Sequence, residues 1–470
     1  MTAVQTPAPR RASPFALARR ILAVGIVWLL PATALAADQR ASRPAPTPER
    51  AAAELGYDLS RPLTLDQCIA IALRAHPDIR VAVAALHGAI ADLDRARAAL
   101  WPSVTGGTDY TVTKNPQRTV QVGGVPVPVG GGQTTTRNWA LTGSYTVYQM
   151  GRDLTISQAK TMRRAAGAGV EDTCRELAYL VSQAYFGVLA ADRLVKAQEE
   201  SAAAAQGHVD SVQALIDADE AAPVEIHTVR AQLHQAQLDL LSARNQAAIA
   251  RANLRAALGG PATEVQIADA WREPTSLPVL SECLEAAGTD RPDVQQARAS
   301  LRAATLGLRL ARLQQYPQVG VGTSAEWGRF NGDTGSGWSV FGSIEQPLFD
   351  GGAVKAGIDS ARADVESAQA QLDRLSQQMR LEVETAWLNL RRSAEGIAAA
   401  EAARTEARAS LAAAERRYPD AAILLEVIDA QARATRAEVD YISAIYDYNI
   451  ALADLQRATA GEREQGTGDK

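Results

Sequence analysis

The chain repeats one pattern twice, and this internal duplication limits the folds that it can adopt. Residues 63–110 match residues 278–325 at an offset of 215, and later segments match at an offset of 201. The matched pairs are Cys68 with Cys283, Pro77 with Pro292, Trp101-Pro102 with Tyr316-Pro317, Tyr148 with Phe349, Glu225 with Glu426 and Leu254 with Leu455. Units of about 200 residues are too long for a solenoid, whose repeats have roughly 20–50 residues. The duplication therefore predicts two similar halves of one body.

Each half begins with an alanine-rich segment, for which we predict a helix over 65–100 and over 280–315. Both segments end at an aromatic residue followed by proline. Proline lacks the backbone donor that a helix needs. We therefore expect Pro102 and Pro317 to mark the entry into a strand.

Four segments with period-two alternation are predicted to be strands, at 102–113, 138–148, 317–328 and 337–349. The apolar residues that we expect to face lipid are Val104, Tyr110, Trp139, Leu141, Tyr145, Val321, Trp327, Trp338 and Ile344. The opposite face is rich in Ser, Thr and Gly, with Phe341 as an exception. The lengths suit tilted membrane strands of about 9–11 residues. A soluble β-sandwich is the alternative, although the polar face is poorly suited to burial.

The intervening segments 114–133 and 329–337 are rich in glycine and polar residues, so we interpret both as turns. Long proline-free stretches follow, from Gly151 to about Ala214 and from Gly352 to about Arg417. Each predicts a very long helix that reverses at a polar turn into a second helix, over 224–258 and 423–459. Helical hairpins of this length cannot form a globular core alone, so they must pack against copies or partners.

The composition argues against several functions. The net charge of −5 comes without a basic cluster, so we expect no nucleic-acid partner. The chain has neither a G-x-S-x-G motif, an H-E-x-x-H motif nor a P-loop, so we expect no enzyme activity, cofactor or catalytic metal. Its three cysteines are too few and too widely separated for a disulfide framework or a zinc site.

The first 36 residues resemble a signal peptide. Four arginines at positions 10, 11, 19 and 20 precede an apolar core at 21–30, and Ala34-Leu35-Ala36 fits a cleavage site. A membrane anchor is the alternative, but the apolar run is short for a span and contains Pro31. We expect a mature chain that starts at Ala37 and, without a cysteine there, carries no lipid. We expect three segments outside the repeats: a flexible segment at 37–62, a linker at 263–277 and a disordered tail at 461–470.

Four strands cannot close a membrane barrel, because the smallest barrels need about eight strands. Open sheet edges are not tolerated in lipid, so several chains must share one barrel. Two chains would supply 8 strands, three would supply 12 and four would supply 16. The pattern itself leaves this choice open.

The chain resembles the TolC family of outer-membrane factors. The resemblance covers 63–460 and rests on LTLDQCIAIALRAHPDI (63–79), the Trp101-Pro102 step, QPLFDGG (346–352), RRYPDAAILLEVIDAQ (416–431) and Asp454-Leu455. It implies a mainly α fold with a small β part, in which a homotrimer shares a 12-stranded outer-membrane barrel continued by a long periplasmic α-helical barrel. It places the repeats at 63–262 and 278–460. The implied partners are outer-membrane lipid, a periplasmic adaptor, and an inner-membrane ABC transporter or other pump.

The same resemblance suggests a functional site at the start of the last helix. Glu426 and Asp429 lie three residues apart, on one helix face. In the family pattern, paired carboxylates here line a narrow periplasmic entrance, and Tyr418 would supply the tyrosine of a latch. The arginine of that latch has no counterpart between Pro419 and Asp429. Two solvated carboxylates stabilised by the helix dipole are the alternative interpretation.

Two export functions remain open. The missing lipid-acceptor cysteine and the likeness to toxin exporters of the adenylate cyclase–haemolysin type favour type I secretion of a polypeptide. The alternative is the outer-membrane duct of a small-molecule or drug efflux pump. A soluble periplasmic coiled-coil scaffold is a third, structural possibility.

Overall fold

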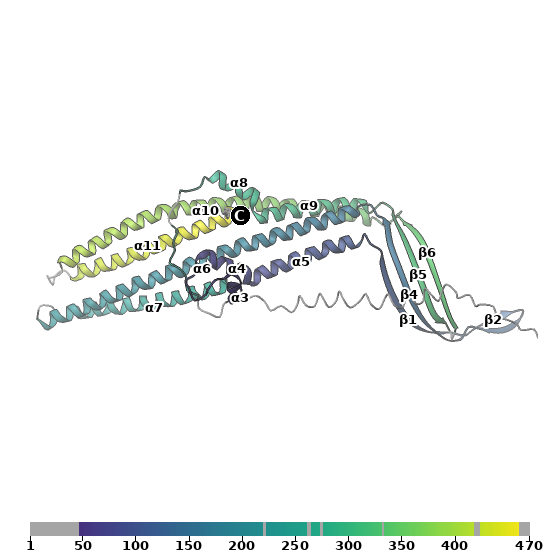
Figure 1. Cartoon of the computed structure of the whole chain (residues 1–470), viewed down its shortest axis with the longest axis horizontal. Helices are drawn as coiled ribbons and strands as arrows, with labels where there is room; N and C mark the ends of the chain where they lie inside the picture. The colour runs from purple at the N-terminus through teal and green to yellow at the C-terminus, as the bar shows by residue number, and fades with distance from the viewer. Residues whose placement is uncertain are drawn as a thin grey trace, which may run out of the picture.

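The computed structural model describes residues 47–219, 222–260, 265–272, 276–330, 333–417 and 424–459. The molecule is elongated, with long helices side by side along its axis and a β-sheet at one end (Figure 1). The long helices extend from the sheet to the opposite end of the molecule. The predicted signal peptide 1–36, the tail 461–470 and Tyr418 lie outside the described residues.

The two repeats contain the same series of main elements. The short helix α3 (Pro48–Leu55) precedes the first repeat, which comprises α4 (Leu65–Ala75), α5 (Pro77–Ala98), β1 (Ser103–Asn115), β2 (Arg118–Val122), β3 (Val125–Val129), β4 (Gly132–Tyr148), α6 (Arg152–Asp217) and α7 (Glu225–Ala257). The second comprises α8 (Leu280–Asp290), α9 (Pro292–Leu313), β5 (Gln318–Phe330), β6 (Asp333–Glu345), α10 (Ala353–Arg417) and α11 (Leu424–Thr459). The mainly helical fold and its duplication are confirmed.

The first helix of each repeat is broken in two, whereas we expected unbroken helices over 65–100 and 280–315. The breaks fall at Pro77 and Pro292, which begin α5 and α9. Proline is tolerated in the first turn of a helix but not in its interior. Thr64 and Gln67 form a capping box at the start of α4, and His76 accepts a hydrogen bond from the backbone N–H of Asp78 to cap α5. The elements ahead of each strand are therefore two helices joined at a corner.

The four long strands form one antiparallel sheet in the order β1-β4-β5-β6. The central pair β4–β5 joins the two repeats, with Trp139 directly opposite Trp327. In the described part of the chain, β1 and β6 are the two edges of this sheet. Pro102 and Pro317 each stand immediately before a strand, β1 and β5 respectively.

The segment 114–133 differs from the expected turn, because most of it is ordered as strand. It contains the hairpin β2–β3, which turns at Gly123 and Gly124 with φ of +61° and +80°. Two consecutive residues with positive φ suit a tight hairpin turn, and glycine adopts that conformation without strain. The second expected turn, 329–337, is also shorter than expected, because β6 already begins at Asp333. β6 ends at Glu345, whereas we expected the strand to reach 349.

The main core lies where α3, α4 and α7 pack around the middle of α6. Tyr185 is fully buried, and its hydroxyl donates to the carbonyl of Ala268 over 2.7 Å. Ala51 and Ala52 of α3 are also buried in this core. Helix α3, within the segment expected to be flexible, therefore packs against this core. Ile267, within the expected linker, pairs with Leu63 as an isolated bridge.

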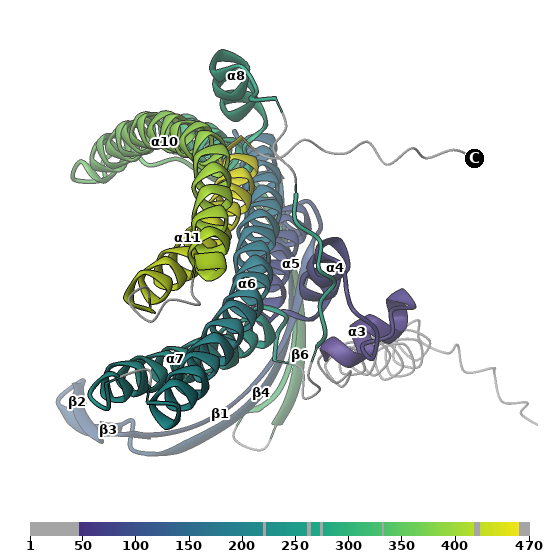
Figure 2. The ribbon, with the colours of Figure 1, turned by 90° about the vertical axis from the view of Figure 1, so that its left-hand side faces the viewer.

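The long helices pair as two antiparallel hairpins, α6 with α7 and α10 with α11. Viewed along the axis, the four helices follow an arc (Figure 2). Within the described ranges, no helix combines the length and apolar character needed to cross a bilayer.

Candidate functional site

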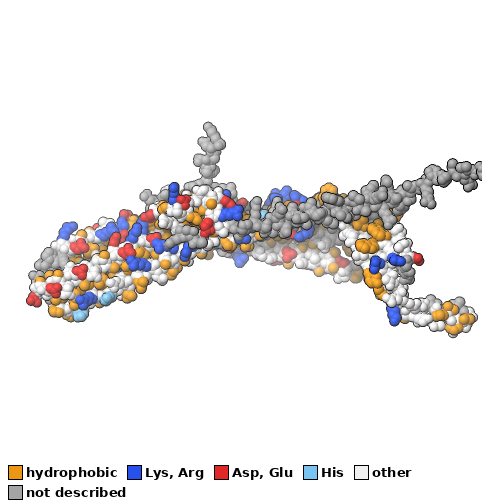
Figure 3. Space-filling model, turned by 60° about the horizontal axis from the view of Figure 1, so that its bottom comes forward, with side chains coloured by type: hydrophobic (Ala, Val, Ile, Leu, Met, Phe, Trp, Pro, Cys, Tyr) orange, Lys and Arg blue, Asp and Glu red, His pale blue; other side chains and the backbone are white. Residues whose placement is uncertain are grey.

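The sheet has one apolar and one polar face. Directly opposite residues in an antiparallel pair share a face, and the strand registers place all nine residues expected to face lipid on the same side of the sheet. Most of them are exposed in the single chain, and Trp338 and Ile344 keep 75% and 78% of their surface. The space-filling view shows hydrophobic side chains gathered over the sheet (Figure 3). Such an exposed apolar patch marks an interaction surface.

The other face carries short polar side chains. Ser103 and Ser144 are hydrogen-bonded across β1–β4 over 2.8 Å, and Ser324 and Ser339 across β5–β6 over 2.9 Å. Phe341 lies on this polar face directly opposite Gly322, where a Cβ would overlap its ring. The glycine therefore makes room for an aromatic side chain that breaks the sequence pattern.

The predicted carboxylates lie at the end of the molecule farthest from the sheet. Glu426 accepts from Arg417, at the end of α10, over 3.0 Å, and Asp429 pairs with Arg433 one helical turn later. Both carboxylates are about half exposed, at 52% and 58%. Sequence reasoning missed both arginines, because it searched only between Pro419 and Asp429. The i,i+4 spacing of Asp429 and Arg433 was the available signal.

An apolar contact joins the two hairpins beside these carboxylates. Ile428, between Glu426 and Asp429, packs in a buried cluster with Val212 of α6 and with Ile226 and Val229 of α7. One face of the first turns of α11 is thus fixed against the first repeat. Glu426 and Asp429, on either side of Ile428 in the sequence, are left exposed.

A buried network of charges lies in the middle of the molecule, where the repeats meet. Arg291 is only 2% exposed and binds Asp293 over 2.6 Å and Glu382 of α10 over 2.9 Å. Arg175 of α6 approaches Asp293, and Arg457 of α11 binds Glu176 of α6 over 3.1 Å. Four long elements, α6, α9, α10 and α11, are therefore tied together by ion pairs.

Ionisation of this network is controlled by burial and by the arginines. Burial by itself would raise the pKa of Asp293, but the hydrogen bonds and charge of Arg291 outweigh it and lower that pKa. The pKa of Glu382 is lowered in the same way. Sequence reasoning did not find the network, because comparing the repeats gave no sign of it. The first repeat has His76 at the position that matches Arg291, and the buried Val181 at the position that matches Glu382.

The sequence matches the protein family described as outer membrane efflux protein over residues 68–260 and 283–461, one segment in each repeat. The outer membrane protein OprJ of Pseudomonas aeruginosa is 33% identical over 186 residues, which cover 37% of this chain and only 38% of OprJ. The outer membrane protein TolC of Escherichia coli is 23% identical over 429 residues, covering 87% of this chain and 84% of TolC. Protein CyaE of Bordetella pertussis is 28% identical over 331 residues, covering 66% and 65%.

The fold has a solved counterpart. The CmeC outer membrane channel of Campylobacter jejuni superposes with a TM-score of 0.74 at 17% identity, covering 84% of this chain and 85% of CmeC. The family match spans both repeats, and the fold that the structure shows is that of an outer-membrane channel. The chain therefore belongs to the outer membrane efflux protein family, the TolC family of outer-membrane factors.

Proposed function

We propose that the chain forms the outer-membrane channel of an export system, as a homotrimer in which three four-stranded sheets close one barrel. The observation that carries this proposal is the sheet itself, which has one apolar face, one polar face and two open edges. Three copies give 12 strands, and closure removes every edge, as lipid requires. The apolar face contacts lipid, and the polar face lines the conduit.

The helical part extends the conduit away from the membrane into the periplasm. The ends of α6 and α10 and the starts of α7 and α11 form the tip of the body farthest from the sheet. There a periplasmic adaptor and an inner-membrane ABC transporter or other pump would dock, and Glu426, Asp429 and Tyr418 of three copies would surround the entrance.

For the cargo, we propose a polypeptide exported by type I secretion. The resemblance to toxin exporters supports this choice, as does the lack of a cysteine at the expected mature start. A small-molecule cargo is the second candidate, favoured by the similarity to the fusaric acid resistance protein FusA of Burkholderia cepacia, at 26% identity over 315 residues.

Deleting the gene and analysing both the culture medium and drug sensitivity tests these proposals. We expect one large secreted protein to disappear from the medium and to accumulate in the cell at unchanged synthesis. Drug sensitivity that rises while the secreted proteins stay unchanged would select the efflux function instead. The chain should fractionate with the outer membrane as an oligomer that heat dissociates, and a soluble periplasmic monomer would contradict the channel.

A further inference from the structure

Charged side chains on the four-stranded sheet are segregated between its two faces. Strands β1, β4, β5 and β6 contain three basic residues, and the register places all of them on the apolar face: Lys114, Arg137 and Arg329. The same strands contain four acidic residues, and all of them lie on the polar face: Asp109, Glu326, Asp333 and Glu345. A charge on a face that contacts lipid is costly near the bilayer midplane. The basic residues therefore indicate a specific environment for this part of the apolar face.

We infer that Arg137 and Arg329 bind a phosphate group of a lipid in the outer leaflet of the outer membrane, such as lipopolysaccharide. This inference rests on the proposed channel, in which the apolar face contacts lipid, and it adds a binding site to that face.

The two arginines are neighbours on adjacent strands at the centre of the sheet. Arg137 of β4 lies directly opposite Arg329 of β5, and the Cβ atoms of such a pair are about 4.5–5.5 Å apart. Like charges directly opposite one another destabilise a sheet by repulsion. A phosphate group between them replaces this repulsion by attraction, and each planar guanidinium can donate two parallel hydrogen bonds to phosphate oxygens.

Arg137 is oriented for such a ligand by an aromatic neighbour. Its guanidinium carbon lies 5.4 Å from the centroid of the Tyr110 ring, and Tyr110 is directly opposite Arg137 on the same face. A contact of this kind attracts a cation to the ring. Arg137 makes no hydrogen bond or ion pair with any residue that the structure describes, and its side chain is exposed. Its N–H groups are therefore available to an anion.

The position of the arginines along the strands matches the depth of lipid headgroups. Trp139 lies directly opposite Trp327, two residues closer to the helices on the same two strands, and two residues of a strand span about 7 Å. Tryptophan is enriched at the boundary between hydrocarbon and headgroups. The arginines beyond this boundary lie at the level of the phosphates. Because the long helices join the other end of the sheet (Figure 1), this level belongs to the outer leaflet in the proposed channel.

The surroundings favour a lipid over a free phosphate ion. The apolar face continues from the arginines toward the helices, where Trp139 and Trp327 keep 52% and 46% of their surface exposed. A lipid that places its phosphate between the arginines also lays its acyl chains on this apolar surface. A free phosphate ion would gain only the contacts with the arginines.

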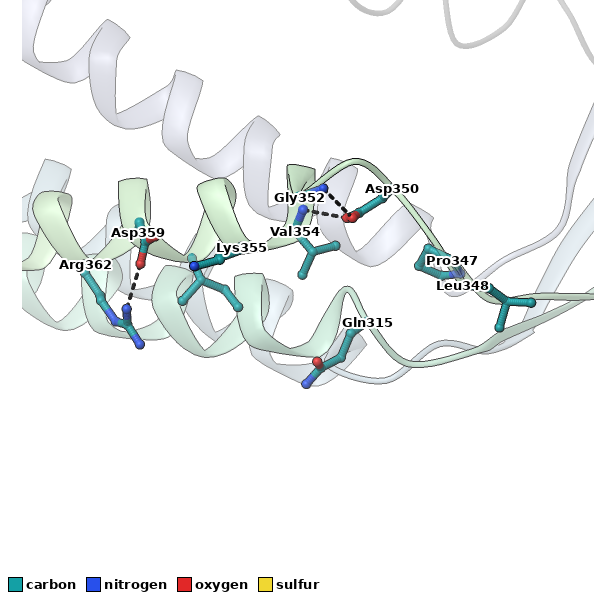
Figure 4. A pocket seen from close by; sticks show the side chains of 10 residues that line it. Gln315, Pro347, Leu348, Asp350, Gly352, Val354, Lys355, Asp359 and Arg362 are labelled. Carbon is teal, nitrogen blue, oxygen red and sulfur yellow. Dashed lines mark hydrogen bonds and ion pairs between the residues drawn. The ribbon is translucent and has the colours of Figure 1, made fainter.

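The cavity at the opposite end of the sheet, at the start of α10, does not offer the same chemistry (Figure 4). It has a volume of about 410 Å³, and its charged lining residues are Asp350, Lys355, Asp359 and Arg362. Two acidic and two basic side chains give this cavity no net charge. Arg362 is already bound to Asp359 over 2.7 Å. The anion site is therefore assigned to the arginine pair rather than to this cavity.

Lipid binding to the purified oligomer of the full chain tests the site. The probe is lipid A with its phosphates, titrated in mild detergent and followed by native mass spectrometry. One cationic side chain near an anionic membrane surface strengthens binding about fivefold. Arg137→Gln with Arg329→Gln should therefore weaken the binding of lipid A roughly 25-fold. The matched control, Arg61→Gln with Arg80→Gln, removes the same charge from exposed positions outside the sheet and should leave the binding unchanged.

The unsubstituted chain provides a second test that needs no variant. Lipid A without its phosphates should bind as weakly as intact lipid A binds to the double arginine variant, and equal binding of the two lipids overturns the phosphate site. Full displacement of lipid A by inorganic phosphate, or equally tight binding of phosphatidylglycerol, overturns the assignment to an outer-leaflet lipid. An oligomer that fails only these lipid tests leaves the channel standing. A chain that forms no outer-membrane oligomer contradicts the proposed function instead.

Discussion

At the scale of single residues, the sheet tolerates Phe341 on its polar face because Gly322 opposite has no side chain. A valine at position 322 would force the ring off its site or shift β5. Overpacking of this kind typically costs about 1–3 kcal/mol. We expect Gly322→Val to lower the temperature at which the oligomer dissociates on a gel. Adding Phe341→Ser should restore most of the loss, and failure of this rescue would show that the glycine is required for another reason.

The tip carboxylates carry a second residue-scale prediction. If Glu426 and Asp429 surround the entrance, their negative charge attracts cations, and the paired arginines Arg417 and Arg433 partly cancel it. In planar bilayers, Glu426→Ala with Asp429→Ala should reduce cation selectivity and remove block by multivalent cations. Arg417→Ala with Arg433→Ala should increase both. Unchanged reversal potentials in the two double variants would identify these residues as ordinary surface charges.

At the scale of elements, the charge network holds α9 and α10 together around Arg291. Removing one partner of a buried ion pair leaves the others uncompensated, at a cost of about 3–5 kcal/mol. We expect Arg291→Met to destabilise the chain by this amount in chemical unfolding followed by circular dichroism. The matched control is Arg61→Met, which breaks an exposed pair with Asp58 and should leave the unfolding curve nearly unchanged, because solvent screens such a pair. Equal effects of the two variants would contradict a structural role for the network.

The same elements predict a dependence of stability on pH. The pKa values of Asp293 and Glu382 are lowered in the folded chain. Their ionised forms therefore contribute fully to the free energy of unfolding at neutral pH, and this contribution is lost as the pH falls below about 4. Asp293→Asn with Glu382→Gln should therefore be less stable than the unsubstituted chain at pH 7. Unfolding curves at pH 7 and pH 3 should show this difference shrinking on acidification. A difference that stays constant would mean that the two carboxylates do not titrate with folding.

At the scale of the whole molecule, the two faces of the sheet should respond differently to charge. Arginine at Val104, Leu141, Val321 or Ile344 would be placed in lipid, at a cost of roughly 2–4 kcal/mol near the bilayer midplane. Arginine at Ser103 or Ser324 would lie in the water-filled conduit and should leave assembly intact. The yield of heat-labile oligomer in outer-membrane fractions measures both sets. Equal losses would contradict the assignment of the faces.

The sequence by itself determined the duplication, the long helices and the alternation of the strands. The offsets of 215 and 201, the missing prolines and the period of two can all be read from the order of the residues, without knowing which residues are in contact. It also identified the family. It could not show that Pro77 and Pro292 begin new helices at corners, or that 118–129 forms a hairpin. Only the tertiary structure paired Glu426 with Arg417, placed Phe341 over Gly322 and brought Arg291 to Glu382. These contacts join residues far apart in the chain or across a turn, and their partners depend on how the helices and strands pack rather than on spacing.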